Sequence, residues 1–201
     1  MARQTSRGVP ACWDAFVVGF CCSLVTNRPK RGKLDGFEHD APGSGDLSAR
    51  LYRKKILFLC TGNYYRSRFA EHLFNALAEK RGLDWRADSR GLALERGVNN
   101  VGAISWHAVQ GLAVRGLTVP GDEPLPRQVT TADFATADKI IALDESEHRP
   151  LIAERFPRWT DAVEYWLIHD SGKTLPESAL EQIEQRVQQL VDRLHEGSAR
   201  K

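Results

Sequence analysis

One short stretch of the chain holds residue types that could do chemistry together. It reads Cys60-Thr61-Gly62-Asn63-Tyr64-Tyr65-Arg66-Ser67. The stretch follows an apolar run at residues 56–59 and precedes a segment with helical periodicity. A loop that leaves a buried strand and enters a helix directs its backbone N–H groups at one point, where the helix dipole also favours an anion. The position of the stretch therefore predicts an anion-binding loop with a cysteine at its start.

Five residues of this loop suit phosphate chemistry. The positive field of the loop favours the nucleophilic thiolate form of Cys60, the alternative being a small hydrophobic residue in the core. Arg66 carries a planar fork that can hold two phosphate oxygens, and Ser67 can donate a hydrogen bond to the thiolate. Gly62 gives the loop backbone freedom, and Asn63 is expected to order it by side-chain hydrogen bonds. Apart from a proton donor, these are the parts that covalent phosphoryl transfer needs.

The elements that must position this loop alternate along the chain. The continuous apolar run at residues 56–59 is typical of a strand that is buried on both faces of a parallel sheet. Further strands are predicted at residues 85–89, 139–143 and 163–168. Helices are predicted from the end of the loop to a cap at Gly82, and at residues 104–115, 146–155 and 176–194. This alternation predicts an α/β fold with a doubly wound parallel sheet, covered by helices on both faces.

The composition of the 201 residues is that of an ordinary globular protein, with 42% hydrophobic and 27% charged residues. The formal net charge of +2 does not favour nucleic-acid binding. No basic stripe interleaves the later tryptophans, so they are predicted to be packing residues. These are Trp85, Trp106, Trp159 and Trp166. The six histidines show no metal-ligand spacing, so neither a metal nor another cofactor is expected.

The first 50 residues differ in character from residues 51–201, which we expect to form the domain. Charged residues, glycines and prolines are scattered over residues 26–50 and predict a flexible extension. The apolar run at residues 15–27 is shorter than the roughly 20 residues that a helix needs to cross a bilayer. It abuts Asp14, and no small-x-small cleavage site follows it, which speaks against a signal peptide. We therefore expect a cytoplasmic protein without membrane insertion.

The loop and its surroundings together resemble those of a known family. The Cys-x-Gly-Asn-x-x-Arg-Ser pattern follows an Ile-Leu-Phe-Leu strand, and further matches are Ala70-Glu71, Ser89-x-Gly91, Arg127-Gln128 and Asp138. Over about residues 54–196 the chain resembles the low-molecular-weight protein tyrosine phosphatases, a family that also includes protein arginine phosphatases and thioredoxin-coupled arsenate reductases. The resemblance implies a flavodoxin-like four-stranded sheet and a monomeric hydrolase that forms a cysteinyl-phosphate. Its substrate would be a phosphorylated protein or a small phosphomonoester, of the phosphotyrosine type.

The resemblance also implies roles for individual residues. Cys60 would be the nucleophile and Arg66 the phosphate clamp. The substrate-binding residues would be Thr61, Gly62, Asn63, Tyr64, Tyr65 and Ser67. The family's proton donor is an aspartate, usually followed by proline, in the loop after the fourth strand; the candidate here is Asp170, with Ser171 in the place of the proline. The other nearby carboxylate, Asp161, precedes the strand and would lie at the wrong end of the sheet.

Three departures from the family pattern leave the substrate open. Tyr64 stands where the tyrosine phosphatases generally have an aliphatic residue and the arginine phosphatases a threonine, so it either forms an aromatic wall or narrows the pocket. Tyr65 replaces the second family cysteine, and residues 171–173 replace aromatic residues after the proton donor. Arsenate reduction needs further cysteines, and none follows Cys60. A protein arginine phosphatase and a non-catalytic phosphate-binding module are therefore the alternatives to a tyrosine phosphatase.

Overall fold

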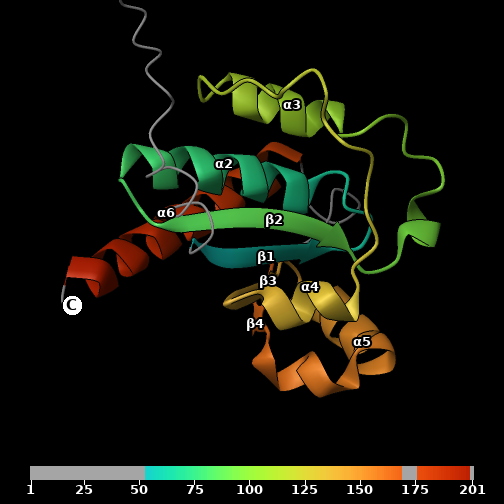
Figure 1. Ribbon diagram of the computed structural model, residues 1–201. Helices are drawn as coiled ribbons and strands as arrows, with labels where there is room; N and C mark the ends of the chain where they lie inside the picture. Colours follow the sequence, from blue (N-terminus) through green and yellow to red (C-terminus); the bar gives the residue numbers. More distant parts are fainter. Residues whose placement is uncertain (1–52, 169–175, 200–201) are drawn as a thin grey trace, which may run out of the picture. The chain divides into compact units, whose positions relative to one another are not determined.

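The computed structural model describes residues 53–168 and 176–199, and its strands form one parallel sheet (Figure 1). The four strands are β1 (Lys54–Cys60), β2 (Trp85–Gly91), β3 (Lys139–Ala142) and β4 (Glu164–Tyr165), in the order β2-β1-β3-β4. β1 therefore lies in the interior of the sheet, between β2 and β3. This is the flavodoxin-like order, so the predicted fold class is confirmed. The predicted extension at residues 1–50 lies outside the described residues.

Helices cover both faces of the sheet (Figure 1). One face carries α2 (Arg66–Lys80), α3 (Trp106–Ala113) and α6 (Pro176–Ala199). The other face carries α4 (Thr131–Thr136) and α5 (Glu145–Arg155). Two short 3₁₀ helices lie at Leu94–Gly97 and Pro157–Ala162. Within the described ranges, no helix is long and apolar enough to cross a membrane.

The apolar run of β1 is buried because the two sides of the strand belong to two cores. Ile56 and Phe58 face α2, α3 and α6, and Phe58 packs edge-on against Phe74 with 6.1 Å between ring centroids. Leu57 and Leu59 belong to the core on the side of α4 and α5. Alternate side chains of β1 therefore pack against the helices on both faces of the sheet. This packing holds the carboxyl end of β1, where the loop begins, in place.

Apart from shifted ends and the two short 3₁₀ helices, the observed elements differ from the sequence prediction at a strand and at a helix. Of the predicted strand at residues 163–168, only β4 has strand geometry, because its partner β3 ends at Ala142. Beyond β4, the N–H of Ile168 still donates to the carbonyl of Leu143, which keeps the chain beside the end of β3. Helix α4 was not predicted, because its six residues are too few to show a helical periodicity. Its capping box, formed by Thr130 and Asp133, is the sequence signal for it.

The later tryptophans divide between the core and the surface. Trp166 is buried, and Trp85 and Trp159 pack against the two cores, as predicted. Trp106 is 67% exposed, so the prediction that it is a packing residue is wrong. It is the first residue of α3, and this helix turns only later residues toward the core.

Candidate active site

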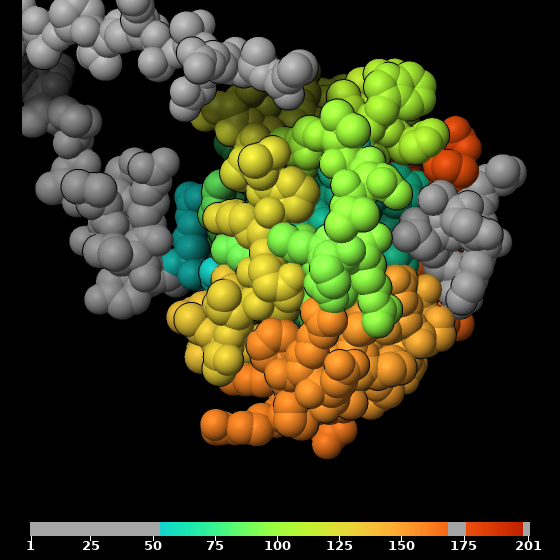
Figure 2. Space-filling model, turned by 90° about the vertical axis from the view of Figure 1, so that its right-hand side faces the viewer, coloured from blue at the N-terminus to red at the C-terminus, as the bar shows by residue number. Residues whose placement is uncertain are grey.

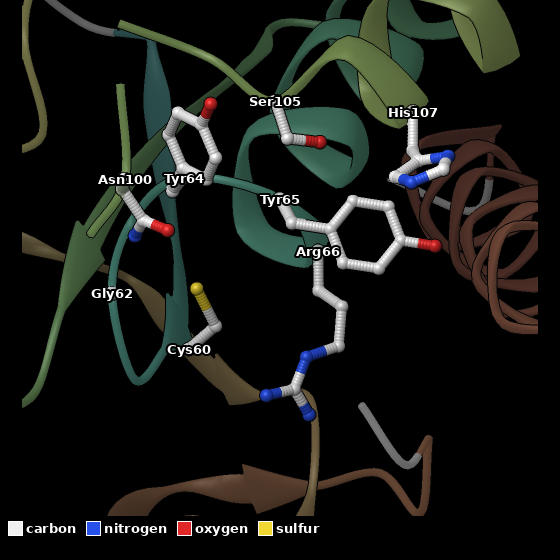
Figure 3. Close-up of a pocket in the computed structure, with 8 residues that line it drawn as sticks. All are labelled: Cys60, Gly62, Tyr64, Tyr65, Arg66, Asn100, Ser105 and His107. Carbon is white, nitrogen blue, oxygen red and sulfur yellow. The ribbon is translucent and has the colours of Figure 1, made fainter. Parts of the chain in front are cut away.

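Cys60 ends the interior strand β1, and Arg66 begins the following helix, α2. Figure 2 looks onto this edge of the sheet, where the chain after β2 (green), the chain before α4 (yellow) and α5 (orange) gather around the end of β1. A cavity of about 220 Å³ lies over the loop. It is lined by Cys60, Gly62, Tyr64, Tyr65, Arg66, Asn100, Ser105 and His107 (Figure 3). The cysteine and the arginine of the loop therefore border one space.

The loop turns sharply at Asn63, whose φ is 48°. Asparagine is one of the few residues other than glycine that tolerate this left-handed conformation. The prediction that Gly62 supplies the backbone freedom is therefore corrected: a Cβ at Gly62 would instead come 3.2 Å from the amide nitrogen of Asn100. On the neighbouring strand, a Cβ at Gly91 would lie 3.0 Å from the carbonyl oxygen of Thr61. The two glycines thus allow neighbouring segments to approach the loop closely.

A chain of hydrogen bonds links the cysteine sulfur to a partly buried carboxyl group. Ser67 Oγ lies 3.0 Å from Cys60 Sγ. Asn63 Nδ2 donates both to Ser67 Oγ, at 3.2 Å, and to Ser89 Oγ, at 2.8 Å. Ser89 in turn donates to Glu71 Oε2 at 2.6 Å. Because the amide of Asn63 donates in both directions, the hydroxyl proton of Ser67 is available to the sulfur, where it stabilises a thiolate.

The same network holds the loop from behind. The backbone N–H of Arg127 donates to Asn63 Oδ1 at 2.9 Å, and Arg68 Nε donates to the Asn63 carbonyl at 3.3 Å. Burial raises the pKa of the Glu71 carboxyl above its ordinary value. Asn63 and Ser67 are fully buried and do not line the cavity. These two residues, predicted to bind substrate, therefore support the shape of the loop.

Arg66 is held by two acids and a carbonyl at the ends of β3 and β4. Its side chain is 2% exposed. Nη2 donates to Glu147 Oε2 at 2.8 Å, and Nη1 donates to the carbonyl of Ile168 at 3.0 Å. Asp144 Oδ2 lies 3.7 Å from Nη1. Neither acid is among the residues predicted from the sequence, although both follow β3, whose carboxyl end lies beside that of β1.

Glu147 also binds the first residue of the loop. Thr61 Oγ1 donates a hydrogen bond to Glu147 Oε1, and Nε2 of the buried His148 lies 3.3 Å from the same hydroxyl. His148 Nδ1 accepts the backbone N–H of Asp144 at 3.0 Å, so the proton of the neutral ring is on Nε2 and faces Thr61. Burial on its own would raise the pKa of Glu147, but the hydrogen bonds from Thr61 and Arg66 outweigh it and hold the pKa below its ordinary value. Glu147 is therefore an ionised clamp on the loop and Arg66, and not a proton donor.

Replacing Glu147 by glutamine should lower the stability of the fold at neutral pH. Glutamine keeps the shape but loses the charge that pairs with Arg66, and a hydrogen bond to a charged group contributes about 1.5–3 kcal/mol. We expect the free energy of unfolding at neutral pH to fall by about 2 kcal/mol. A carboxyl whose pKa is lowered in the fold stabilises it above the ordinary pKa, and this stabilisation is lost as the pH falls through the folded value. The difference between wild type and variant should therefore shrink below about pH 4.

Urea unfolding from about pH 3 to about pH 7 measures this difference. The matched control is Glu145→Gln on the same helix, because Glu145 pairs with Arg149 at the surface, where the two side chains are 48% and 45% exposed. The control should change stability by less than about 0.5 kcal/mol. A stability loss in Glu147→Gln that stays constant over the whole pH range would contradict the assignment.

The two tyrosines of the loop form walls of the cavity. In Figure 3 both hydroxyl groups point away from the sulfur of Cys60. Tyr64 donates to the carbonyl of Val101, and Tyr65 to the carbonyl of Pro176, each at 2.8 Å. Tyr64 therefore lines the cavity while its hydroxyl is engaged elsewhere, a position compatible with the aromatic wall that is one of the two possibilities from the sequence.

Three residues that were not predicted complete the cavity: Asn100, Ser105 and His107. Ser105 caps α3 by accepting the N–H of Ala108 at 3.1 Å, and its own N–H donates to the carbonyl of Tyr64 at 2.9 Å. A serine before a helix is a recognisable cap, but the sequence does not show that this cap lies against the loop. Of the substrate-binding residues predicted in the loop, Gly62, Tyr64 and Tyr65 line the cavity, whereas Thr61 turns to Glu147.

The predicted proton donor, Asp170, lies outside the described residues. The described chain before it ends at Ile168, whose carbonyl accepts a hydrogen bond from Arg66. Among the described residues, no group of three or more His, Cys, Asp and Glu side chains is placed to hold a metal ion.

A free, buried cysteine and an arginine share one cavity, in the loop between β1 and α2 of a flavodoxin-like sheet, and this arrangement suits a thiolate nucleophile beside an anion clamp. Residues 55–200 match the family model described as low molecular weight phosphotyrosine protein phosphatase. The chain therefore belongs to this family of cysteine-dependent hydrolases, which confirms the resemblance seen in the sequence.

Relatives of two specificities are similar to the chain. The protein-arginine-phosphatase of Bacillus subtilis is 32% identical over 109 residues, which are 54% of this chain and 67% of that protein. The low molecular weight phosphotyrosine protein phosphatase of Mus musculus is 34% identical over 105 residues, which are 51% of this chain but only 63% of the mouse protein. Among solved structures, a YwlE mutant from Bacillus subtilis has a TM-score of 0.59 at 26% identity and covers 70% of this chain and 98% of its own. YfkJ from the same organism also has a TM-score of 0.59 at 26% identity, with coverages of 72% and 96%.

Proposed function

We propose that the protein hydrolyses phosphotyrosine-type phosphomonoesters of proteins through a cysteinyl-phosphate on Cys60. The observation that carries this proposal is the shared cavity of Cys60 and Arg66, with Ser67 Oγ 3.0 Å from the sulfur. A monomeric state, a cytoplasmic location and a domain at residues 51–201 are further parts of this proposal.

The reaction proceeds in two displacements at phosphorus. The thiolate of Cys60 attacks the phosphorus, and the bond from phosphorus to the tyrosyl oxygen breaks while Asp170 gives that oxygen a proton. Arg66 and the loop N–H groups hold the phosphoryl oxygens during transfer. Asp170 then accepts a proton from water, which attacks the phosphocysteine and releases phosphate and the thiolate. Ser67 stabilises the thiolate at the start and the end of the cycle.

The walls of the cavity favour an aryl phosphate over a phosphorylated guanidine. Tyr64, Tyr65 and His107 border the space above the sulfur, and aromatic rings pack well against a phenyl ring. A protein arginine phosphatase is the alternative that the Bacillus subtilis relative suggests. The guanidine group of phosphoarginine would pair best with a carboxylate beside the phosphoryl group. Glu147 does not serve this purpose, because it is already bound to Arg66 and Thr61.

The test compares turnover of para-nitrophenyl phosphate, a phosphotyrosine peptide and a phosphoarginine peptide. We expect hydrolysis of the first two and a lower kcat/KM for the third. Asp170→Asn should lower kcat for the phosphotyrosine peptide by about 10²- to 10⁴-fold, the usual contribution of acid–base catalysis. Asp161→Asn, which changes an exposed carboxylate in the 3₁₀ helix Pro157–Ala162, is the matched control and should leave kcat unchanged.

Two outcomes would replace the proposal. A higher kcat/KM for phosphoarginine would assign the protein to the arginine phosphatases. Tight binding of phosphotyrosine peptides without turnover, unaffected by Asp170→Asn, would indicate a phosphate-binding module without catalytic activity.

A further inference from the structure

A second groove adjoins the active-site cavity. It lies between α3 and α6 and has a volume of about 450 Å³. Its lining includes Trp106, His107, Val114, Leu180 and Glu181. His107 lines both spaces, so the groove lies beside the cavity that holds Cys60.

The floor and one rim of the groove are apolar. Gly111 of α3 lets the helices approach closely, because a Cβ there would come 2.4 Å from Leu180 Cδ1. Leu180 is buried beneath the groove, at 4% exposure. Trp106 and Val114, on the rim, are 67% and 79% exposed. Two large apolar side chains beside one groove suit contact with a partner better than contact with water.

The other rim is acidic. Helix α6 contributes Glu177, Glu181 and Glu184 to it. Glu184 is bound to Arg115 through two hydrogen bonds, of 2.9 and 2.6 Å. Glu177 and Glu181 form no ion pair with any other described residue, so they can accept an incoming cation. The exposed indole of Trp106 adds a ring face on which a guanidinium or ammonium group can lie.

A few residues of an extended peptide would span the distance from the cavity to the groove. The ring centroids of Tyr65 and His107 are 6.3 Å apart, and those of His107 and Trp106 are 5.6 Å apart. An extended peptide advances by about 3.3–3.6 Å per residue. A substrate whose phosphorylated residue occupies the cavity would therefore reach the groove about three or four residues away.

We propose that the groove between α3 and α6 binds the segment of the phosphoprotein substrate that flanks the phosphorylated residue, and selects an apolar residue followed by a lysine or arginine. The apolar side chain packs on Leu180 beside Trp106, and the cation pairs with Glu177 and Glu181. This inference rests on the proposed function, because the flanking segment reaches the groove only when the phosphorylated residue is bound in the neighbouring cavity.

The experiment compares three phosphotyrosine peptides with the wild-type protein. One carries Leu-Arg three and four residues from the phosphotyrosine on both sides, the second carries Leu-Glu there, and the third carries Ala-Ala. We expect kcat/KM to be about tenfold higher for the first peptide than for the second, with the third between them. Trp106→Ala should reduce the preference, and the double variant Glu177→Lys/Glu181→Lys should reverse it. Neither change should alter turnover of para-nitrophenyl phosphate, which cannot reach the groove.

The matched control is Glu154→Lys, which reverses an exposed charge on α5, on the other face of the sheet. It should leave the preference among the peptides unchanged. Equal kcat/KM for all three peptides, or a preference that Glu154→Lys alters as much as the double variant does, would overturn the proposal. So would a dimer in sedimentation that Trp106→Ala dissociates without effect on peptide preference, because a second copy would then occupy the groove.

Failure of the proposed function gives a different result. In that case the wild-type protein hydrolyses neither para-nitrophenyl phosphate nor any of the peptides. Binding of the same labelled peptides, measured by fluorescence anisotropy, then tests whether the groove selects the flanking segment. Tighter binding of the Leu-Arg peptide supports this selection, and equal binding of all three peptides overturns it.

Discussion

Cys60→Ser should abolish hydrolysis of para-nitrophenyl phosphate, with a loss in kcat of at least about 10⁴-fold. The hydroxyl of serine does not ionise near neutral pH, so the loop would stabilise no nucleophile. The environment of the sulfur should survive, because Cys60 is 3% exposed and serine has nearly the same shape. Phosphate binding should therefore be retained while turnover is lost.

The matched variant is Ser67→Ala, which removes the hydrogen-bond donor at 3.0 Å from the sulfur but keeps the thiol. We expect it to lower kcat by about 10- to 100-fold, the effect of one lost hydrogen bond to a charged group. Steady-state turnover measures both effects, and calorimetry with inorganic phosphate measures binding. Full activity in Cys60→Ser would rule out a cysteinyl-phosphate.

Arg66→Ala should remove both activity and stability. The loss of the phosphate clamp should lower kcat/KM by at least about 10³-fold. The same change leaves the buried acid Asp144 and the clamp Glu147 without this cation, and breaking a buried ion pair costs about 3–5 kcal/mol. The total stability of a domain is only about 5–15 kcal/mol, so this variant will be close to unfolding.

Arg66→Lys separates the two effects. Lysine keeps the positive charge beside Asp144 and Glu147 but lacks the planar fork that holds two oxygens. We expect a stability loss of no more than about 2 kcal/mol, together with a loss in kcat/KM of about 100-fold. Denaturant unfolding and turnover on para-nitrophenyl phosphate measure the two quantities. Near-normal kcat/KM in Arg66→Lys would show that the guanidinium does not clamp the phosphoryl group.

The central part of the site could be predicted because its residues are neighbours in the chain. The apolar run of β1, the loop and the first turn of α2 form one continuous stretch, so the spacing of Cys60 and Arg66 already places them at one strand end. Three further residues of the family pattern, Glu71, Ser89 and Arg127, turn out to hold Asn63 and thereby the loop. Their role was hidden in the sequence because it depends on contacts between β2, α2 and the chain before α4.

The amino-acid sequence by itself determined the alternation of strands and helices and the loop that begins with Cys60, because these depend on periodicity and spacing over a few residues. The flavodoxin-like class was implied by the resemblance to the family. The tertiary structure alone decided that Glu147 and Asp144 hold Arg66, that Asn63 takes the left-handed turn, and that His107 lies between the cavity and a groove. Which strand ends meet at one edge is set by the order of strands in the sheet. Residues 80 or more positions apart are brought together by that order, and no local pattern of side chains encodes it.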